Sequence, residues 1–211
     1  MRLFALATVA TVLLLSGCSA VNYKAAMPDV SVNCVDTLAG MPGTPLRFPV
    51  EGEEPDEYEG YVEFAQLAHC YRPAGGAAMP VALYKLESIT PPAEVKVSVQ
   101  LSTGGTFAAA LDVLDADMRP LRRYGFDAFV RRGSTYALDV FLNPSDHAPA
   151  YLLLMPDAAH VGRKDVAVGS QGSAAPILAG PVIFTYMSSV GVQTENPLVQ
   201  AGKVRVVGRP H

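Results

Sequence analysis

The sequence contains no tryptophan, only three cysteines, and charged residues at only 17 % of its positions. Half of its residues are apolar, a composition that suits neither a disordered chain nor a membrane helix bundle. The net charge of −4 argues against nucleic acid as a partner and against electrostatic adhesion to anionic lipid. Without tryptophan, a sugar-binding platform would need another aromatic ring, such as Tyr124.

The sequence also lacks the common catalytic motifs. It has no G-x-S-x-G elbow, no H-E-x-x-H, no P-loop and no C-x-x-C. The histidines are scattered, and His69 with its neighbour Cys70 would point to opposite faces of a strand, which makes a poor metal clamp. The carboxylates of Asp112, Asp115 and Asp117 lie around a turn, where bonding to backbone amides is more common than acid/base catalysis. We therefore expect that the protein is not an enzyme and that it binds no metal and no cofactor. A hydrolase with an unrecognised site is the alternative that the sequence supports least. The four histidines are His69, His147, His160 and His211.

The N-terminus, in contrast, carries a recognisable signal. Arg2 precedes an uncharged apolar run, and Leu15-Ser-Gly-Cys18 has the layout of the box that precedes an acylated cysteine in bacterial lipoproteins. The run is too short to span a bilayer and lies where a cleaved signal belongs. We predict a signal peptide over 1–17, lipid attachment (palmitate among the acyl chains) at Cys18, and a tether over 18–27. An ordinary signal peptide with a chance cysteine is the alternative.

This signal implies a location. The chain would be exported to the periplasm and held on a membrane by its acyl chains, since two or more chains give stable anchoring. Ser19 follows the acylated cysteine, and the resemblance to Gram-negative lipoprotein signals with this residue implies the outer membrane. In that oxidising compartment, Cys34 and Cys70 predict one disulfide, with two unpaired buried thiols as the alternative.

The region after the tether has the pattern of an all-β protein. Val95, Val97, Val99 and Leu101 alternate with polar residues, the pattern of a half-buried antiparallel strand. Phe107–Leu114 also fits a helical stripe, but turn residues on both sides favour a strand. Eight or so short strands without a long helix predict a single β-sandwich domain, jelly-roll-like, over 28–211. The other predicted strands are 46–50, 61–67, 81–86, 135–142, 150–155, 181–187 and 203–207.

Three intervals between these strands predict turns or loops. Six carboxylates fall within 51–59, but the calcium-loop pattern is absent, so a solvated loop is favoured over a calcium site. Asp157 predicts a cap for one helical turn that ends near Gly162. The interval 169–180 is rich in Gly, Ser and Ala and predicts a mobile loop.

The order of elements resembles a known family. Glu94-Val-Lys-Val-Ser-Val99, Leu111-Asp-Val-Leu-Asp-Ala-Asp-Met-Arg-Pro120, Arg132-Gly133 with the following strand, and Tyr151-Leu-Leu-Leu-Met155 are similar to segments of the maltose operon periplasmic proteins. The similar region covers about 93–162, and a second, weaker similarity covers 180–191. The resemblance implies an exported protein of the maltose system, active in carbohydrate transport, without assigned catalytic residues.

One basic interval is the candidate partner-binding surface. Five arginines and three aromatic residues lie between 119 and 132, and such residues are enriched at binding hot spots. Alternatively, the interval is a loop whose arginines meet the acidic segment 51–59 or water. The candidate binding residues are Arg119, Arg122, Arg123, Tyr124, Phe126, Arg131 and Arg132.

Two non-enzymatic functions follow. The first is a lipid-anchored binding or accessory protein of the envelope, in maltose or maltodextrin uptake as the resemblance implies, with carbohydrate or an envelope protein as its partner. The second is a structural accessory lipoprotein of a secretion or envelope assembly.

Overall fold

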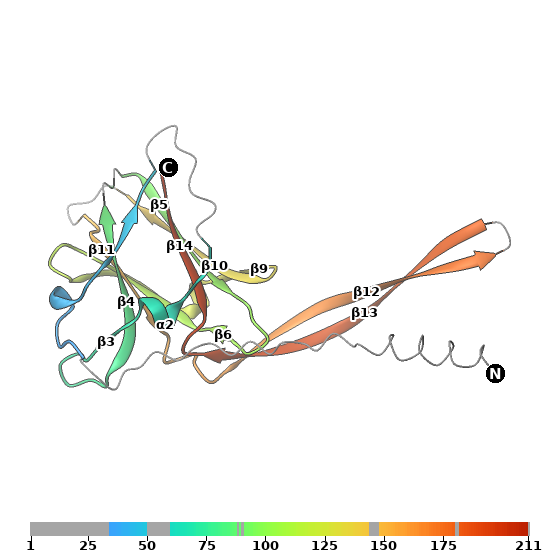
Figure 1. Cartoon of the computed structure of the whole chain (residues 1–211), viewed down its shortest axis with the longest axis horizontal. Helices are drawn as coiled ribbons and strands as arrows, with labels where there is room; N and C mark the ends of the chain where they lie inside the picture. Colours follow the sequence, from blue (N-terminus) through green and yellow to red (C-terminus); the bar gives the residue numbers. More distant parts are fainter. Residues whose placement is uncertain are drawn as a thin grey trace, which may run out of the picture.

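The structure, a computed structural model, describes residues 34–49, 60–87, 89, 91–143, 148–179 and 182–210. Two sheets pack face to face, and a long hairpin projects from one end of them (Figure 1). The predicted β-sandwich is confirmed. Cys18 and the acidic segment 51–59 lie outside the described residues, as do residues 144–147 between the predicted strands 135–142 and 150–155.

The first sheet has the strand order β1-β4-β11-β7-β8, with β3 paired to β4. Its pairs are antiparallel except β1 with β4, which is parallel. Its strands are β1 (Thr44–Arg47), β3 (His69–Tyr71), β4 (Met79–Glu87), β7 (Ala109–Leu114), β8 (Pro120–Tyr124) and β11 (Tyr151–Pro156).

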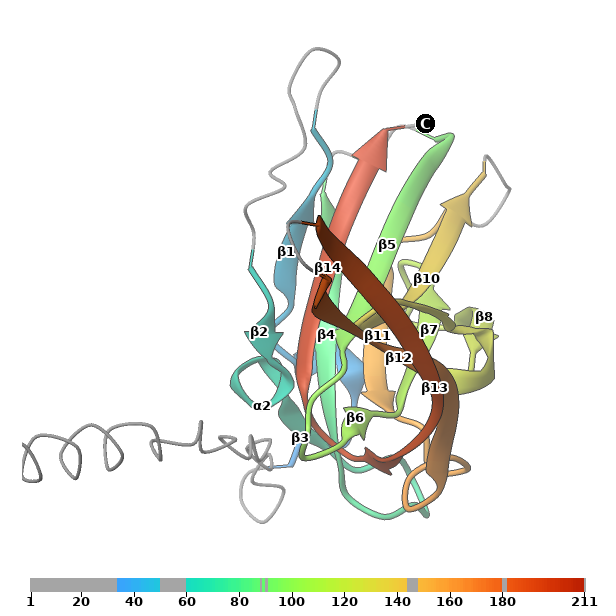
Figure 2. The same cartoon turned by 90° about the vertical axis from the view of Figure 1, so that its right-hand side faces the viewer.

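The second sheet has the order β2-β14-β5-β10-β9 and is antiparallel throughout. Figure 2 shows its three long strands, β14, β5 and β10, side by side. Its strands are β2 (Val62–Glu63), β5 (Ala93–Gln100), β9 (Val130–Arg132), β10 (Thr135–Leu142) and β14 (Lys203–Pro210).

The alternating strand at the centre of this sheet is the one that the sequence predicts. Val95, Val97 and Val99 of β5 are fully buried in the core between the sheets, while Glu94 and Lys96 are half-buried on the other face. Burial of a valine side chain contributes about 1.5–3 kcal/mol. Leu101, expected on the same face, lies just after the strand and is half-buried.

Most of the ambiguous interval 107–114 forms a strand, as predicted: β7 covers Ala109–Leu114, whereas Phe107 lies in a separate short strand. All six residues of β7 are buried, which explains why strict alternation is missing from its sequence. Leu111 and Val113 enter the core between the sheets, whereas Ala110 and Leu114 enter a second cluster that includes Met41. The strand is therefore covered on both faces.

The predicted disulfide between Cys34 and Cys70 is present. It ties the segment before η2 (Leu38–Gly40) to β3, and two backbone bonds reinforce it, from Val35 N–H to the Cys70 carbonyl and from Arg72 N–H to the Val35 carbonyl, each 3.0 Å long. In the chain-entropy model, closing a loop of this length stabilises a fold by about 3–4 kcal/mol.

Two local predictions are wrong. Phe64–Leu67 forms one short helical turn, α2, within the predicted strand 61–67. The predicted loop 169–180 belongs instead to β12 (Lys164–Ala179). The predicted strand 181–187 is confirmed, although it is the start of a longer strand, β13 (Val182–Val199). Gly, Ser and Ala have weak intrinsic preference for strands, so composition suggested a loop, but sixteen residue pairs with β13 hold β12 extended.

The β12–β13 hairpin extends away from the sandwich (Figure 1). It leaves the sandwich between β11 and β14 in the chain. Among the strands that the structure describes, its backbone pairs only with β6 (Thr106–Phe107), which runs parallel to the last residues of β13. Within the described residues, no helix is long and apolar enough to cross a membrane.

Candidate interaction site at the projecting hairpin

The base of the hairpin is fixed to the sandwich by backbone and side-chain bonds. Leu198 and Val199 of β13 pair with Thr106 and Phe107 of β6. The Asn196 amide nitrogen donates to the buried Thr106 hydroxyl at 2.6 Å. A polar contact at a fully buried hydroxyl holds β13 in one register against β6.

A second attachment joins the hairpin to the edge of the second sheet. Asp165, near the start of β12, accepts a hydrogen bond from the Tyr136 hydroxyl of β10, and the Arg131 guanidinium of β9 lies 3.4 Å from the same carboxylate oxygen. Burial, together with the hydrogen bond and negative charge of Asp165, raises the pKa of Tyr136 to about 12, although Arg131 acts in the opposite direction. The phenol therefore stays a donor at physiological pH.

A third attachment is the turn that leads into β12. Asp157 accepts hydrogen bonds from the backbone of Phe126 (2.8 Å) and Ala159 (3.0 Å), and one oxygen lies 2.8 Å from His160 Nδ1. Burial raises the pKa of Asp157, but these three hydrogen bonds outweigh it and hold the pKa below its usual value. The predicted Asp157 cap is confirmed, and Gly162 ends the turn with φ of +85°.

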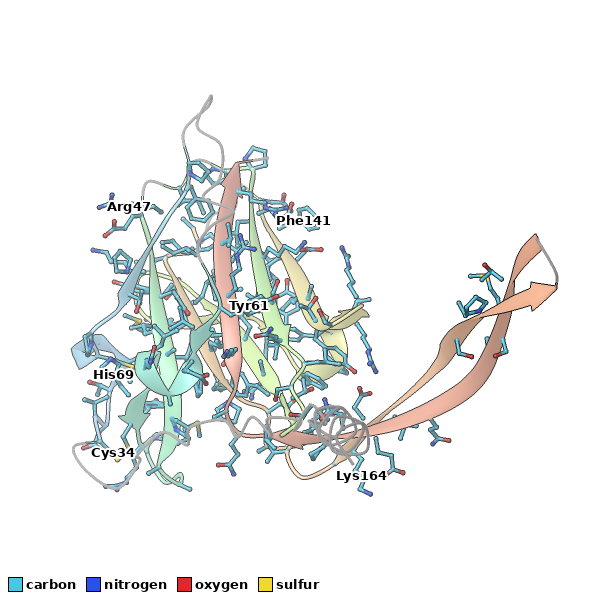
Figure 3. The ribbon with its side chains drawn as sticks, turned by 45° about the vertical axis from the view of Figure 1, so that its right-hand side comes forward. Cys34, Arg47, Tyr61, His69, Phe141 and Lys164 are labelled. Carbon is cyan, nitrogen blue, oxygen red and sulfur yellow. A yellow bond between two sulfur atoms is a disulfide. The ribbon has the colours of Figure 1, made fainter. Side chains whose placement is uncertain are left out.

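Beyond this base, the described side chains of the hairpin are mostly exposed (Figure 3, where Lys164 marks the base). Met187 is 79 % exposed and Val166 50 %, the former opposite Ala174 and the latter opposite Glu195 in the register. The Ser173 and Ser188 hydroxyls bond across the hairpin at 2.8 Å.

The predicted basic interval forms two edge strands rather than a loop. β8 ends one side of the first sheet, β9 ends the second, and the 3-10 turn η3 (Phe126–Ala128) connects them. Pro120 and Gly133 suggest turns and so favour a loop, but each short strand pairs with a longer neighbour. The structure thus brings the arginines together along one edge of the sandwich.

Each of these arginines already has a partner in the fold. Arg122 donates to the Phe141 carbonyl at 2.8 Å. The other four lie within 4 Å of carboxylates: Arg119 of Asp117, Arg123 of Asp112, Arg131 of Asp165 and Arg132 of Asp139. Phe126 and Phe129 are buried, and Tyr124 is half-buried. The edge supports the sandwich and the hairpin base, and its role in partner binding stays a prediction.

The carboxylates that could be considered for catalysis take part in contacts that stabilise the fold. Asp115 accepts the backbone N–H of Asp117 (2.9 Å) and of Arg119 (2.8 Å), as expected for a turn. Burial raises the pKa of Asp112, with Arg123 opposing the shift. Asp112 is thus a buried carboxylate opposite a cation in the register, and neither group adjoins a nucleophile in the contacts described above.

The histidines are dispersed in the structure as well. His69 is exposed on β3, and the His160 ring packs against Phe126 with centroids 5.9 Å apart. His147 and His211 lie outside the described residues. Across the part of the chain that the structure describes, no three His, Cys, Asp or Glu side chains converge in a metal-binding group.

No family model, curated protein or solved structure matches this chain. The resemblance to the maltose operon periplasmic proteins therefore stays a prediction from the sequence.

Sequence reasoning missed the hairpin, most of whose described side chains are exposed. A signal for it was available: no Asp, Glu, Lys, Arg or His occurs anywhere in 166–194, and Lys164 and Glu195 lie just outside that interval. Their side chains meet across the hairpin at 2.6 Å, which marks the boundary between its charged base and its uncharged arm.

Proposed function

We propose that this chain is a non-enzymatic, lipid-anchored accessory protein of the bacterial envelope, whose hairpin is the element that contacts another protein. The single observation that carries the proposal is a long, uncharged hairpin that projects from a sandwich to which its base is firmly bonded. An isolated two-stranded hairpin is marginally stable in water. The sixteen residue pairs of the hairpin would therefore gain stability from a protein partner.

This geometry favours the structural-accessory function over carbohydrate binding. The arginines of the basic edge are engaged within the fold, and Tyr124 is half-buried, whereas the hairpin offers unpaired strand edges and exposed apolar side chains such as Met187. A role in maltodextrin uptake rests on the sequence resemblance alone. Periplasmic location and the acyl anchor at Cys18 rest on the signal sequence.

The proposal is tested by shortening the hairpin. Gly169 and Val192 lie opposite each other, so residues 170–191 can be replaced by Asn-Gly, a dipeptide suited to a two-residue hairpin turn. The full-length lipoprotein is extracted in mild detergent, and the mass of its assembly is measured. We expect the wild type in an assembly larger than a monomer and the shortened form as a monomer with an unchanged melting temperature.

The matched control is Arg122→Ala with Arg123→Ala, which alters the basic edge and leaves the hairpin intact. We expect this variant to keep the wild-type assembly. A shortened protein that stays in the same assembly, or a wild type that is itself monomeric, would contradict the proposal.

A further inference from the structure

The hairpin has two free strand edges in the described structure. β12 is the end strand of its sheet, and β13 meets a third strand only at Leu198 and Val199. Exposed strand edges present backbone donors and acceptors to any extended chain, and natural proteins usually protect them with charges, proline or a covering element.

The two edges differ in their protection. β12 contains Pro176, which lacks an N–H donor and is typical of an edge that does not pair further. β13 has neither proline nor charge from Val182 to Thr194, and valine, isoleucine, phenylalanine, tyrosine and threonine are frequent in the stretch up to Val192. Such residues favour strand pairing. The outer edge of β13 is therefore the open edge.

From this difference we infer that β13 pairs with β13 of a second copy of this chain, antiparallel and centred on Met187, to form a two-fold dimer. This inference rests on the proposed function and names its partner. In this register, Val182 of one copy lies opposite Val192 of the other. Pairing over this overlap supplies about ten backbone hydrogen bonds, the number of direct hydrogen bonds in a typical protein interface.

Charge and solvation favour a second copy over other occupants. Two identical uncharged strands meet without repulsion, whereas an acidic or basic partner strand would find no counter-charge between 166 and 194. A bilayer is a poorer occupant, because every unpaired N–H and C=O of the free edges would lie in hydrocarbon at a cost of several kcal/mol each. Two-fold pairing of like surfaces is also the commonest form of homo-oligomer.

The exposed side chains at the centre of the hairpin suit this arrangement. Ser173, Ala174, Met187, Ser188 and Ser189 line a shallow hollow on the hairpin, in which all but Ser188 are exposed. The other four residues that line the hollow are serine or alanine, and their small side chains leave room beside Met187 for the methionine of the second copy. The two Met187 residues would face each other directly across the dimer axis.

Cysteine crosslinking tests this register. The full-length lipoprotein carries Met187→Cys, and two differently tagged copies are expressed together in a Gram-negative host. The two Cα atoms would lie about 4.5–5.5 Å apart, within the range for a disulfide. The control is Ser173→Cys on β12, an exposed position that would lie about three strand spacings, or about 14 Å, from its copy.

We expect a reducible dimer containing both tags for Met187→Cys and none for Ser173→Cys. Absence of that dimer, equal crosslinking at both positions, or an adduct of Met187→Cys with a different protein would each overturn the inference. The last outcome would leave the proposed function standing, because the hairpin would still contact a protein. Burial of a monomeric Met187→Cys in lipid, detected as protection from a membrane-impermeant maleimide, would overturn it as well.

A charge exchange provides a second readout. Met187→Lys places two like charges opposite each other and is expected to weaken the dimer by about tenfold in dissociation constant. Mixing Met187→Lys with Met187→Glu copies is expected to restore a mixed dimer. Ser173→Lys is the matched control, expected to leave dimerisation unchanged, and a dimer insensitive to Met187→Lys would overturn the inference.

Discussion

The hydroxyl of Tyr136 donates a hydrogen bond to the carboxylate of Asp165 and so joins the second sheet to the first residues of the hairpin. Tyr136 is nearly buried, and its ring also packs against Phe126 at a centroid distance of 4.9 Å. This pair therefore holds the base of the hairpin in a fixed orientation relative to the core of the sandwich.

Removal of that hydroxyl is expected to loosen the base. Tyr136→Phe should lower the free energy of unfolding by about 1.5–3 kcal/mol, the range for a hydrogen bond to a charged group. Thermal unfolding measures the loss, and faster amide exchange at Asp165 and Val166 locates it. Tyr124→Phe on β8 is the control, and a Tyr136→Phe protein indistinguishable from it would refute a role for this pair.

The same tyrosine predicts that the folded protein loses stability at alkaline pH. Its pKa is raised from 10.0 to about 12 in the folded protein, so its contribution to stability is complete below pH 10 and is lost as pH rises from 10 toward 12. Absorbance at 295 nm follows the ionisation of the tyrosines, and one late step near pH 12 should disappear in Tyr136→Phe.

Asp157 predicts sensitivity to acid. Because its pKa in the folded protein lies below the ordinary value of 3.8, the ionised carboxylate stabilises the fold above that pH, and the contribution is lost as pH falls below it. Asp157→Ala also leaves the Phe126 N–H without its acceptor, at a cost of about 1–3 kcal/mol. Acid unfolding is the measurement, and Asp127→Asn, an exposed carboxylate of the adjacent turn, should leave it unchanged.

Asp112 predicts the opposite dependence of stability on pH. Burial raises its pKa, so ionisation costs stability above the folded pKa, and this cost is relieved as pH falls through that value. We expect Asp112→Asn to raise the free energy of unfolding at pH 7. Arg123→Ala removes the cation 3.7 Å away and should lower it by up to about 1 kcal/mol, whereas no such loss is expected in the Asp112→Asn background. Urea unfolding of the double-mutant cycle decides between these outcomes.

Lipid attachment predicts a labelling result. Radioactive palmitate should enter the wild type and Cys34→Ser but not Cys18→Ser, because we predict that the box 15–18 directs acylation to that cysteine alone. Equal labelling of Cys18→Ser would exclude the lipoprotein assignment.

The sequence predicts strands best where burial produces a simple pattern. The alternation of Val95, Val97 and Val99 arises from one buried face, and it predicts β5 correctly. β7 was ambiguous, because both of its faces are buried and its apolar residues run without a period. The helical turn α2 is too short to show a helical period of its own.

The hairpin was missed for a different reason. Half of the residues of its first strand are Gly, Ser or Ala, and its pairing with β13 depends on contacts between residues apart in the chain. The basic interval was located correctly in the sequence, but its partners, such as Asp139 and Asp165, could be found only once the sheets were assembled.

Amide hydrogen exchange tests most directly whether the hairpin is the contact element. The detergent-extracted protein is compared in its assembled state and after dilution to monomers, with β8 and β9 as internal references. Our account predicts slow exchange for β13 between Val182 and Val192 in the assembly and fast exchange in the monomer, with little change in the reference strands. Equal exchange of β13 in the two states, or protection confined to β8 and β9, would contradict it.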